Sequence, residues 1–549
     1  MIMEPTMHCS TKAKPIAVRL SCRSLSKLAL PALALLLLAS CNVGPRYHAP
    51  APVAPPEYKE ATAAPTVPSP AAGQPDPTLK GLGAWQVAAP SDATLRGNWW
   101  ELYNEPELNA LEAQLDINNQ NIQQAYENFM AARATVRQAR AALYPTATVG
   151  AGGSRNRTSS NVTGSVGSTY TALDLTSGIS WEPDLWGKVR NSVKQAQATA
   201  QVSAATLINA RLSAQASLAQ YYFELRGQDA LRQILTETVQ ADQKSLDYNR
   251  AQYETGIGME LTVAQAQSTV EAAQSTLINL GVTRTQYEHA IATLIGKPAA
   301  EFTLPERPLL ITPPAIPVGL PSQLLERRPD VAAAERTLAA ANAQIGIGKA
   351  AYYPSLSLSA TGGLDSSTWK HLIDWPSRVW SIGPSVSETV FDAGLRRAQV
   401  QQYEATYRAD LAAYRQTVLT AFQQVEDALS ALRILSEQVQ QQQRAVQASR
   451  RALDLELIRY QEGLDPYINV VTEQNTLLSA QETMAQIEVQ RATASVQLIQ
   501  ALGGGWQRNQ LPTDKQVTQK PSADAKPADA TAQPAPVAES KPAADTAKP

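Results

Sequence analysis

The sequence predicts an α+β fold in which one unit, made of long helices and paired strands, occurs twice along the chain. The first indication is a repeat at an almost constant offset: Tyr144-Pro145 recurs 209 residues later as Tyr353-Pro354, and Gly256 recurs 207 residues later as Gly463. The second is a pair of very long segments without proline that carry helical periodicity. The third is the alternation of polar and apolar residues in short segments, which is typical of strands with one apolar face. Chance matches would not hold this register, so we interpret the chain as a duplication.

Residues 1–40 have the pattern of a bacterial lipoprotein signal peptide. Basic residues precede the apolar run Leu28–Ala39, which is too short to cross a bilayer core of about 30 Å as a helix. The run ends Leu38-Ala39-Ser40-Cys41, which resembles a lipobox, so we expect Cys41 to become the first mature residue and to carry a diacylglycerol thioether and an N-acyl chain. Asn42 is not the aspartate that favours inner-membrane retention in enteric lipoproteins, so we expect the outer membrane. An ordinary signal peptide with a chance cysteine is the alternative.

Two segments outside the repeats have the composition of linkers. Residues 41–95 comprise the lipid anchor and a tether rich in Ala, Pro and Thr, which we expect to be extended. Residues 507–549 are rich in Pro, Ala, Lys and Asp with almost no apolar bulk, and we expect this tail to be disordered. The mature chain would keep a single cysteine, so no intrachain disulfide is expected.

The first repeat is expected at 96–300, a linker at 301–321 and the second repeat at 322–506. Each repeat is predicted to run helix, strand, loop, strand, very long helix, tight turn, helix. No proline lies in 188–255 or 395–462, and at about 1.5 Å per residue each long helix would reach roughly 100 Å. That length is far greater than the width of a compact domain.

Apolar residues in the long helices follow spacings of three and four, which is the pattern of a coiled-coil seam. In the second repeat the seam is predicted at Leu411, Tyr414, Val418, Ala421, Val425, Ala428, Leu432 and Leu435. In the first repeat it is predicted at Ala204, Leu207, Ala214, Leu218, Tyr221 and Leu225, with Arg211 as its one interruption. The alternative, a plain amphipathic helix on a globular core, fits the length of these segments less well.

Strands are predicted near 145–154 and 173–185 in the first repeat and near 354–364 and 379–391 in the second. Alternation over about ten residues is the signature of a membrane barrel, although one such segment also fits a soluble hairpin. Two hairpins are fewer strands than the roughly eight with which bacterial barrels begin, and lipid does not tolerate an open sheet edge. If these strands span the membrane, the barrel must be shared between chains, and three chains would supply twelve strands.

Three stretches carry a resemblance to a known family: Asn98–Leu108 (NWWELYNEPEL), Gly319–Asp330 (GLPSQLLERRPD) and Ala501–Trp506 (ALGGGW). In this order they resemble the outer membrane factor, or TolC-like, family, and within it the OprM/NodT-type outer membrane efflux lipoproteins. The resemblance covers roughly residues 41–506. It implies a homotrimer that shares a 12-stranded transmembrane β-barrel, which continues as a long α-helical barrel across the periplasm. The linker at 301–321 would lie in the equatorial region.

The same resemblance implies a passive duct, the outer membrane channel component of a tripartite efflux or export system. Anchored in outer membrane lipid, the trimer would conduct small molecules from an inner-membrane transporter and a periplasmic membrane-fusion adaptor to the outside. The two tight turns are expected at the periplasmic tips, since glycine permits the positive backbone angle that such turns need. In the family the adaptor docks at these tips, and a purely architectural turn is the alternative. The tip residues are Thr255, Gly256, Ile257, Glu462, Gly463 and Leu464.

The second tip also carries the family's periplasmic constriction, which by position would comprise Leu464, Asp465, Ile468, Thr472 and Glu473. Leu464 and Ile468 would form apolar rings. Thr472 occupies the position of the family's acidic ring, which leaves open whether an acidic gate operates here, and Asp465 or Glu473 is the alternative source of negative charge. Repeated by threefold symmetry, one carboxylate per chain would form a triad that disfavours anions and raises the pKa of its members.

The residues give no sign of an enzyme. The sequence contains no phosphate-binding Gly-Lys loop, dinucleotide fingerprint or metal-ligand cluster, and its four histidines lack ligand-type spacing, so no cofactor and no metal are expected. A net charge of −2 and a pI of 6.2 give no electrostatic footprint for nucleic acid. Two other classes stay open: a lipid-anchored coiled-coil spacer without a channel, and a lipoprotein enzyme or solute-binding protein, which would need a concave pocket.

Overall fold

The computed structural model describes residues 42–50, 55, 58–62, 97–161, 167–308, 313–314, 316 and 326–519. Cys41 and the signal peptide therefore lie outside the described residues. The chain divides into two compact units. The sheet unit takes its described residues from Met1–Pro45, Ala142–Asn191 and Ile345–Val400, and the helical unit from Arg46–Ala141, Ser192–Gln344 and Gln401–Pro549. Each unit combines segments of both repeats.

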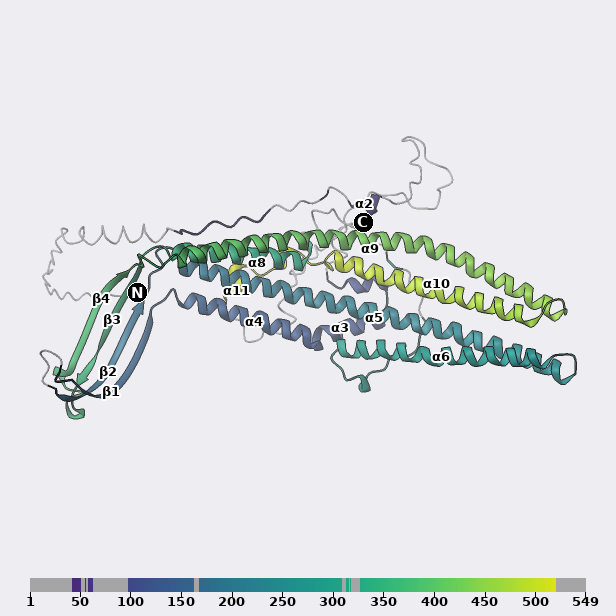
Figure 1. Ribbon diagram of the computed structural model, residues 1–549, viewed down its shortest axis with the longest axis horizontal. Helices are drawn as coiled ribbons and strands as arrows, with labels where there is room; N and C mark the ends of the chain where they lie inside the picture. Colours follow the sequence, from purple (N-terminus) through teal and green to yellow (C-terminus); the bar gives the residue numbers. More distant parts are fainter. Residues whose placement is uncertain are drawn as a thin grey trace, which may run out of the picture. The chain divides into compact units, whose positions relative to one another are not determined.

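The helices repeat with the register that the sequence predicts. α5 (Lys188–Glu254) and α9 (Leu395–Gln461) each contain 67 residues and start 207 residues apart. α6 (Glu260–Leu294) and α10 (Tyr467–Ala501) each contain 35 residues at the same offset, and α4 (Gln120–Ala141) and α8 (Pro329–Ala350) each contain 22 residues at an offset of 209. The predicted duplication is confirmed. In Figure 1 α5 runs beside α6, and α9 runs beside α10, as two long helical hairpins.

One antiparallel sheet contains four strands in the order β1-β2-β3-β4. Its strands are β1 (Thr146–Arg157), β2 (Thr169–Trp181), β3 (Ser355–Ser366) and β4 (Arg378–Ser387). Each repeat supplies one hairpin, and β1 and β4 are the outer strands. The loop between β3 and β4 contains the short turns η4 (Trp369–His371) and η5 (Trp375–Ser377). None of the helices in the described part of the chain combines the length and the apolar character needed to cross a bilayer.

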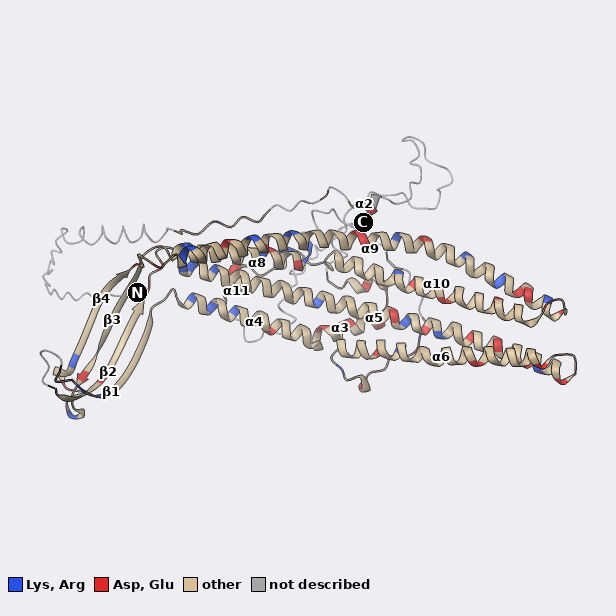
Figure 2. Ribbon diagram, in the orientation of Figure 1, with Lys and Arg blue, Asp and Glu red and all other residues tan. Residues whose placement is uncertain are grey.

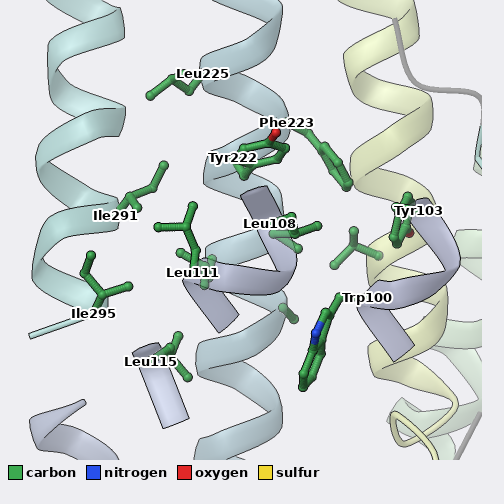
Figure 3. Close-up of a cluster of buried hydrophobic side chains, with 14 of the residues drawn as sticks. Trp100, Tyr103, Leu108, Leu111, Leu115, Tyr222, Phe223, Leu225, Ile291 and Ile295 are labelled. Atoms are coloured by element: carbon green, nitrogen blue, oxygen red, sulfur yellow. The ribbon is translucent and has the colours of Figure 1, made fainter. Parts of the chain in front are cut away.

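The largest apolar core of the helical unit surrounds η2 (Trp99–Tyr103) and α3 (Pro106–Asn118). Leu108, Leu111 and Leu115 recur at spacings of three and four, so they share one face of α3. Figure 3 shows Leu111 and Leu115 between α5 and α6, and Leu108 beside α5. Tyr103 is also buried, and its hydroxyl lies 2.6 Å from Oγ of Ser495 on α10. The segment 98–108 therefore packs against three of the four long helices of the two hairpins.

A buried network of charges fixes the described part of the linker, which begins at the end of η3 (Ala299–Glu301). Arg226 on α5 and Arg284 on α6 donate hydrogen bonds to the carbonyl oxygens of Pro305 and Leu304, both at 2.8 Å. Asp229 lies between the two arginines, at 2.8 Å from one and 2.7 Å from the other. Each buried guanidinium thus has a carboxylate partner, which offsets the cost of removing it from water.

The expectation of an extended tether is wrong near residue 58. Tyr58 is buried in a second core with residues of α9, and it is followed by the short helix α2 (Lys59–Thr62). The backbone N–H groups of the first two residues of α2 donate to the carboxylate of Glu426 at 2.8 and 3.0 Å, and Glu60 pairs with Arg433 at 2.8 Å. One aromatic and one acidic side chain thus hold a segment whose overall composition resembles a free linker.

The expected disorder of the tail is wrong at its start. The chain forms η6 (Arg508–Gln510) and α11 (Asp514–Thr518), and Val517 is fully buried with Phe129 and Val136 of α4. Val517 is the one fully buried apolar residue of this turn, and hydrogen bonds from Arg133 and Gln201 to residues 512–519 also hold it. The average composition of 507–549 does not reveal these contacts. Residues 520–549 lie outside the described residues.

The residues of the predicted coiled-coil seams are buried as expected on α9 but only in part on α5. On α9 the seam is buried from Tyr414 to Ala428, as expected. On α5 the prediction is wrong at Tyr221, which is 37% exposed, whereas Tyr222 and Phe223 are buried. Because α5 packs against α3, α6 and α10 in one core, its buried surface is wider than the single stripe of a coiled-coil seam.

Candidate functional site

The register of the sheet sorts its residues onto two unlike faces. Residues directly opposite each other on neighbouring antiparallel strands point to the same side. Ala151 pairs with Leu175, Leu175 with Leu364, and Ala360 with Ile382. The face that they share is mostly apolar and also carries Ala147, Val149, Ile179, Trp181, Leu356, Leu358, Trp380, Pro384 and Val386. The other face is mostly Ser, Thr and Gly, with two aspartates, Asp174 and Asp365.

The apolar face is open in the single chain. Val149 is 81% exposed and Ile382 is 73% exposed, although both point to the same side as other large apolar residues. A sheet with one uncovered apolar face and one polar face matches the wall of a membrane barrel, which meets lipid outside and water inside. The alternation that the sequence suggested for single strands therefore holds across all four.

Aromatic side chains mark both ends of the strands, a feature that the sequence analysis missed. Nε1 of Trp181 donates to the carbonyl oxygen of Leu143 at 3.1 Å, and Trp186 stacks on Tyr353 with ring centres 4.8 Å apart. These residues lie where the strands join the helices. At the opposite, loop end the exposed aromatics include Trp369, Trp375 and Trp380. Two such belts are typical of the two membrane–water interfaces, and the clustering of tryptophan at the strand ends was the available signal.

Both predicted tips are tight turns closed by a glycine with a positive φ. Gly256 has a φ of +78° and Gly463 a φ of +75°. In the second turn the N–H of Leu464 donates to the carbonyl oxygen of Arg459 at 2.9 Å, which is the closing bond of a Schellman turn. The backbone geometry alone accounts for both glycines. Beside them, Leu464 and Ile257 are largely exposed, and Thr255 and Glu462 are exposed too.

Three of the five predicted constriction residues lie in the second tip turn and the first turns of α10. Ile468 and Thr472 lie one helical turn apart on α10, where the Thr472 hydroxyl donates to the carbonyl oxygen of Ile468 at 2.9 Å, and Leu464 lies in the turn that precedes the helix. Leu464 is 63% exposed and Ile468 47% exposed. The structure therefore offers two apolar side chains on an exposed surface near the tip, where the sequence analysis expects apolar rings.

The two acidic residues considered for the constriction differ in their partners. Asp465 pairs with Arg459, and this hydrogen bond holds the pKa of the Asp465 carboxyl below its usual value. A carboxylate paired with a guanidinium adds no net charge to the surface. Glu473 is half-buried and forms no salt bridge within the described residues, so it is the better candidate for an unpaired negative charge.

A buried polar cluster near the tips links the two helical hairpins. The hydroxyl of Tyr460 donates to Oδ1 of Asn249, and Asn249 and Asp242 are both buried. Burial raises the pKa of Asp242 to about 6, and burial together with the charge of Asp242 raises the pKa of Tyr467 to about 12. This cluster was not among the predicted sites. Asp242 and Asn249 lie seven positions apart on one helix and so share a heptad position, which was a usable signal in the sequence.

The first described residues are fixed to the start of α5. Nδ2 of Asn191 donates to Oδ1 of Asn42 at 3.0 Å, and the N–H of Gly44 donates to the same oxygen at 3.2 Å. The N–H of Val43 also bonds to the carbonyl oxygen of Trp186 at 3.4 Å. The residue that follows the predicted lipidation site is therefore held in the sheet unit, while Cys41 itself lies outside the described residues.

Metal-ligand geometry is absent from the described part of the chain, where no group of three or more His, Cys, Asp or Glu side chains could hold an ion.

Comparisons with known proteins agree with this arrangement. The sequence model of a family described as outer membrane efflux protein matches residues 111–297 and 320–504, one segment for each repeat. The toluene efflux pump outer membrane protein TtgC of Pseudomonas putida is 32% identical over 75% of this chain and 86% of its own length. The pyoverdine export outer membrane protein OpmQ of Pseudomonas aeruginosa is 31% identical over 79% of this chain and 94% of its own length.

Solved structures of outer membrane channels share the fold. The channel OprN aligns with a TM-score of 0.75 and 29% identity, covering 85% of this chain and 100% of OprN. The open state of the MtrE channel of Neisseria gonorrhoeae aligns with a TM-score of 0.71 and 25% identity, covering 85% of this chain and 99% of MtrE.

Proposed function

The chain belongs to the outer membrane efflux protein family and has the fold of TolC-like channels, and from this premise we propose that it is the passive outer membrane duct of a tripartite efflux or export system. The observation that carries the proposal is the four-stranded sheet with one apolar and one polar face. This sheet has too few strands to close a barrel, and its outer strands β1 and β4 need partners in lipid. Three chains would complete a twelve-stranded wall.

Transport through this duct needs no chemistry from the chain. Like the other members of its family, the protein is a channel component and not an enzyme. Ser, Thr and Gly on the polar face of the sheet would line a wet passage, and a passage of this kind selects little. Relatives are named for cargoes as unlike as toluene and pyoverdine. We therefore infer that an inner-membrane transporter supplies the energy and chooses the small molecule.

The tips are the proposed contact with a periplasmic adaptor. Ile257 and Leu464 are large apolar side chains that stay exposed beside the two glycine turns. A single exposed apolar residue is common on protein surfaces. Ile257 and Leu464, however, occupy equivalent positions in the two repeats. Threefold assembly would arrange them in a ring that suits helical hairpins of an adaptor.

Lipidation of Cys41 is the proposed anchor. The contacts of Asn42 and Gly44 support it, because they hold the chain immediately after Cys41 against the unit that carries the sheet. The mass of the N-terminal peptide tests this proposal: we expect added acyl chains in the wild type and none in Cys41→Ser. A wild-type peptide that begins at Cys41 without lipid would contradict it.

The duct itself is tested with the purified, lipid-bearing protein. We expect a trimer in detergent that dissociates on heating, a ring in electron micrographs, and conductance in planar bilayers. A stable monomer without a ring or conductance would point instead to a lipid-anchored coiled-coil spacer.

A further inference from the structure

Three arginines interrupt the apolar face of the sheet. Arg155 and Arg157 alternate with Val149 and Ala151 on β1, so they point to the apolar side. Arg378 is paired with Leu364 across β3 and β4, which places it on the same side. All three are exposed. Each lies at the loop end of its strand, the end away from the flanking helices, where Figure 2 shows charged residues gathering while most of the sheet is uncharged.

These guanidinium groups have no carboxylate on their own side of the sheet. The two acidic residues of the strands, Asp174 and Asp365, are paired with each other on the polar face. Within the described residues, none of the three arginines forms a salt bridge, and Arg378 donates from Nε to the carbonyl oxygen of Trp375 at 3.1 Å. An arginine on a lipid-facing surface is costly at the middle of a bilayer and tolerated only near its interfaces. Arg155, Arg157 and Arg378 therefore belong at the level of the lipid headgroups.

The arginines are also confined to the outer strands. β1 and β4 carry all three, whereas the central strands β2 and β3 contain no Lys or Arg. In a barrel shared by three chains, β4 of one chain must pair with β1 of the next, since no edge can stay open in lipid. The apolar face stays outward around the wall, so Arg378 of one chain and Arg155 and Arg157 of the next would come to the same side of each seam.

We propose that each seam between chains binds the phosphate groups of an outer-leaflet glycolipid, lipopolysaccharide, through these three arginines. The inference rests on the proposed trimeric duct. Guanidinium groups bind phosphate oxygens with two parallel hydrogen bonds, and basic clusters at the membrane surface recognise anionic headgroups. The loop end of the strands lies opposite the helices, so it meets the outer leaflet. The acyl chains of the glycolipid then lie along Val149, Leu175 and Ile382 on the apolar face.

The test uses purified trimers in detergent, titrated with diphosphorylated lipid A and, in parallel, with the same lipid after removal of its phosphates. Native mass spectrometry counts the bound lipids. We expect wild-type trimers to bind the phosphorylated lipid more tightly, at up to three per trimer, and the triple variant R155Q/R157Q/R378Q to lose this preference, with affinity at least about tenfold lower. The matched control R444Q/R450Q/R451Q removes the same charge from exposed arginines of α9 and should bind as the wild type does.

Two results overturn the inference: equal binding of both lipids by wild-type trimers, or unchanged binding by the assembled Gln variant. If the Gln variant does not assemble, R155K/R157K/R378K keeps the charge, and assembled Lys trimers that show no preference for the phosphorylated lipid also overturn it. Inorganic phosphate at the same concentration should not displace the lipid, and full displacement would contradict a headgroup site. If the wild type forms no trimers and shows no conductance, the proposed duct itself is wrong. If its trimers conduct but do not prefer the phosphorylated lipid, only the lipid-binding inference is wrong.

Discussion

At the residue scale, Gly463 has two roles to distinguish: closing the tight turn at the tip, and leaving the tip free to bind an adaptor. Its φ is +75°, and no atom lies within 4 Å of a Cβ built there. Asparagine tolerates this backbone region better than most residues, so Gly463→Asn keeps the turn, and Gly463→Asp adds a charge to a side chain of the same size. We expect Asp to abolish export by intact trimers and Asn to preserve most of it, measured as efflux from cells alongside native gels. Normal export by the Asp variant would remove the docking role.

Ile468, the second residue of α10, gives a second prediction at this scale. Ile468 and Leu464 are both exposed near the tip, so replacing Ile468 with a small polar residue widens and wets a predicted constriction. We expect Ile468→Ser to raise the conductance of purified trimers several-fold in planar bilayers. Ile278→Ser on α6 removes an isoleucine that is more exposed than Ile468 (77% against 47%) and lies away from the tip, and it should leave conductance unchanged. Equal conductance of the two variants would place the constriction elsewhere.

Asp242 predicts a pH dependence of stability. Burial raises its pKa from 3.8 to about 6, so the folded chain holds the proton more tightly than the unfolded chain. The associated stability is complete below the unfolded pKa of 3.8 and is lost as the pH rises through about 6. We expect Asp242→Asn to unfold at a higher temperature than the wild type at about pH 7.5, and the difference to shrink by about pH 4. Asp247→Asn, an exposed neighbour on α5, is the control. Parallel pH curves for wild type and Asp242→Asn would contradict the assignment.

At the scale of elements, the sequence predicts best the helices and strands that occur in both repeats. The long helices and the hairpins follow from patterns that continue over many residues and recur in the second copy, so single exceptions do not hide them. α2 and α11 are short and are held by a few tertiary contacts, among them the buried side chains of Tyr58 and Val517, within segments of linker composition. The error at Tyr221 has another cause: a seam assumes one neighbour, whereas α5 packs against several. Of the candidate site, the tip turns were predictable from glycine, and the pairing of Asp465 with Arg459 was not.

The docked start of the tail provides the prediction at this scale. Val517 is fully buried between α11 and α4, and burying a side chain of this size contributes about 1.5–3 kcal/mol. A chain that stops after Trp506 should therefore be less stable by roughly this amount, because the whole docked turn is lost. A chain that stops after Gln519 retains α11 and is expected to match the wild type in thermal unfolding. Equal stability of both truncations would show that the docked turn contributes nothing.

At the scale of the whole molecule, one chain presents an incomplete wall. Its sheet has two outer strands, its apolar face is uncovered, and its polar face lines no closed space by itself. A helical unit tied together by buried cores can fold within one chain, but the sheet acquires its partners for β1 and β4 only by assembly. The membrane part of this fold is therefore specified by contacts that no single copy can make.

Cysteine pairs across the seam test that dependence directly. The mature chain would otherwise contain only Cys41, so a cysteine at Thr148 on β1 can be combined in turn with one at Gly383, Ser385 or Ser387 on the same polar face of β4. Neighbouring strands bring Cα atoms within about 4.4–6.8 Å, the range a disulfide needs, for only one or two registers. We expect one pair to form covalent trimers on non-reducing gels, adjacent pairs to form fewer, and each single variant to form none. Within one chain the outer strands are separated by β2 and β3. Cross-linked products that end at three copies can therefore come only from β4 of one chain lying beside β1 of the next. If no pair gives cross-links in conducting trimers, another strand order closes the wall.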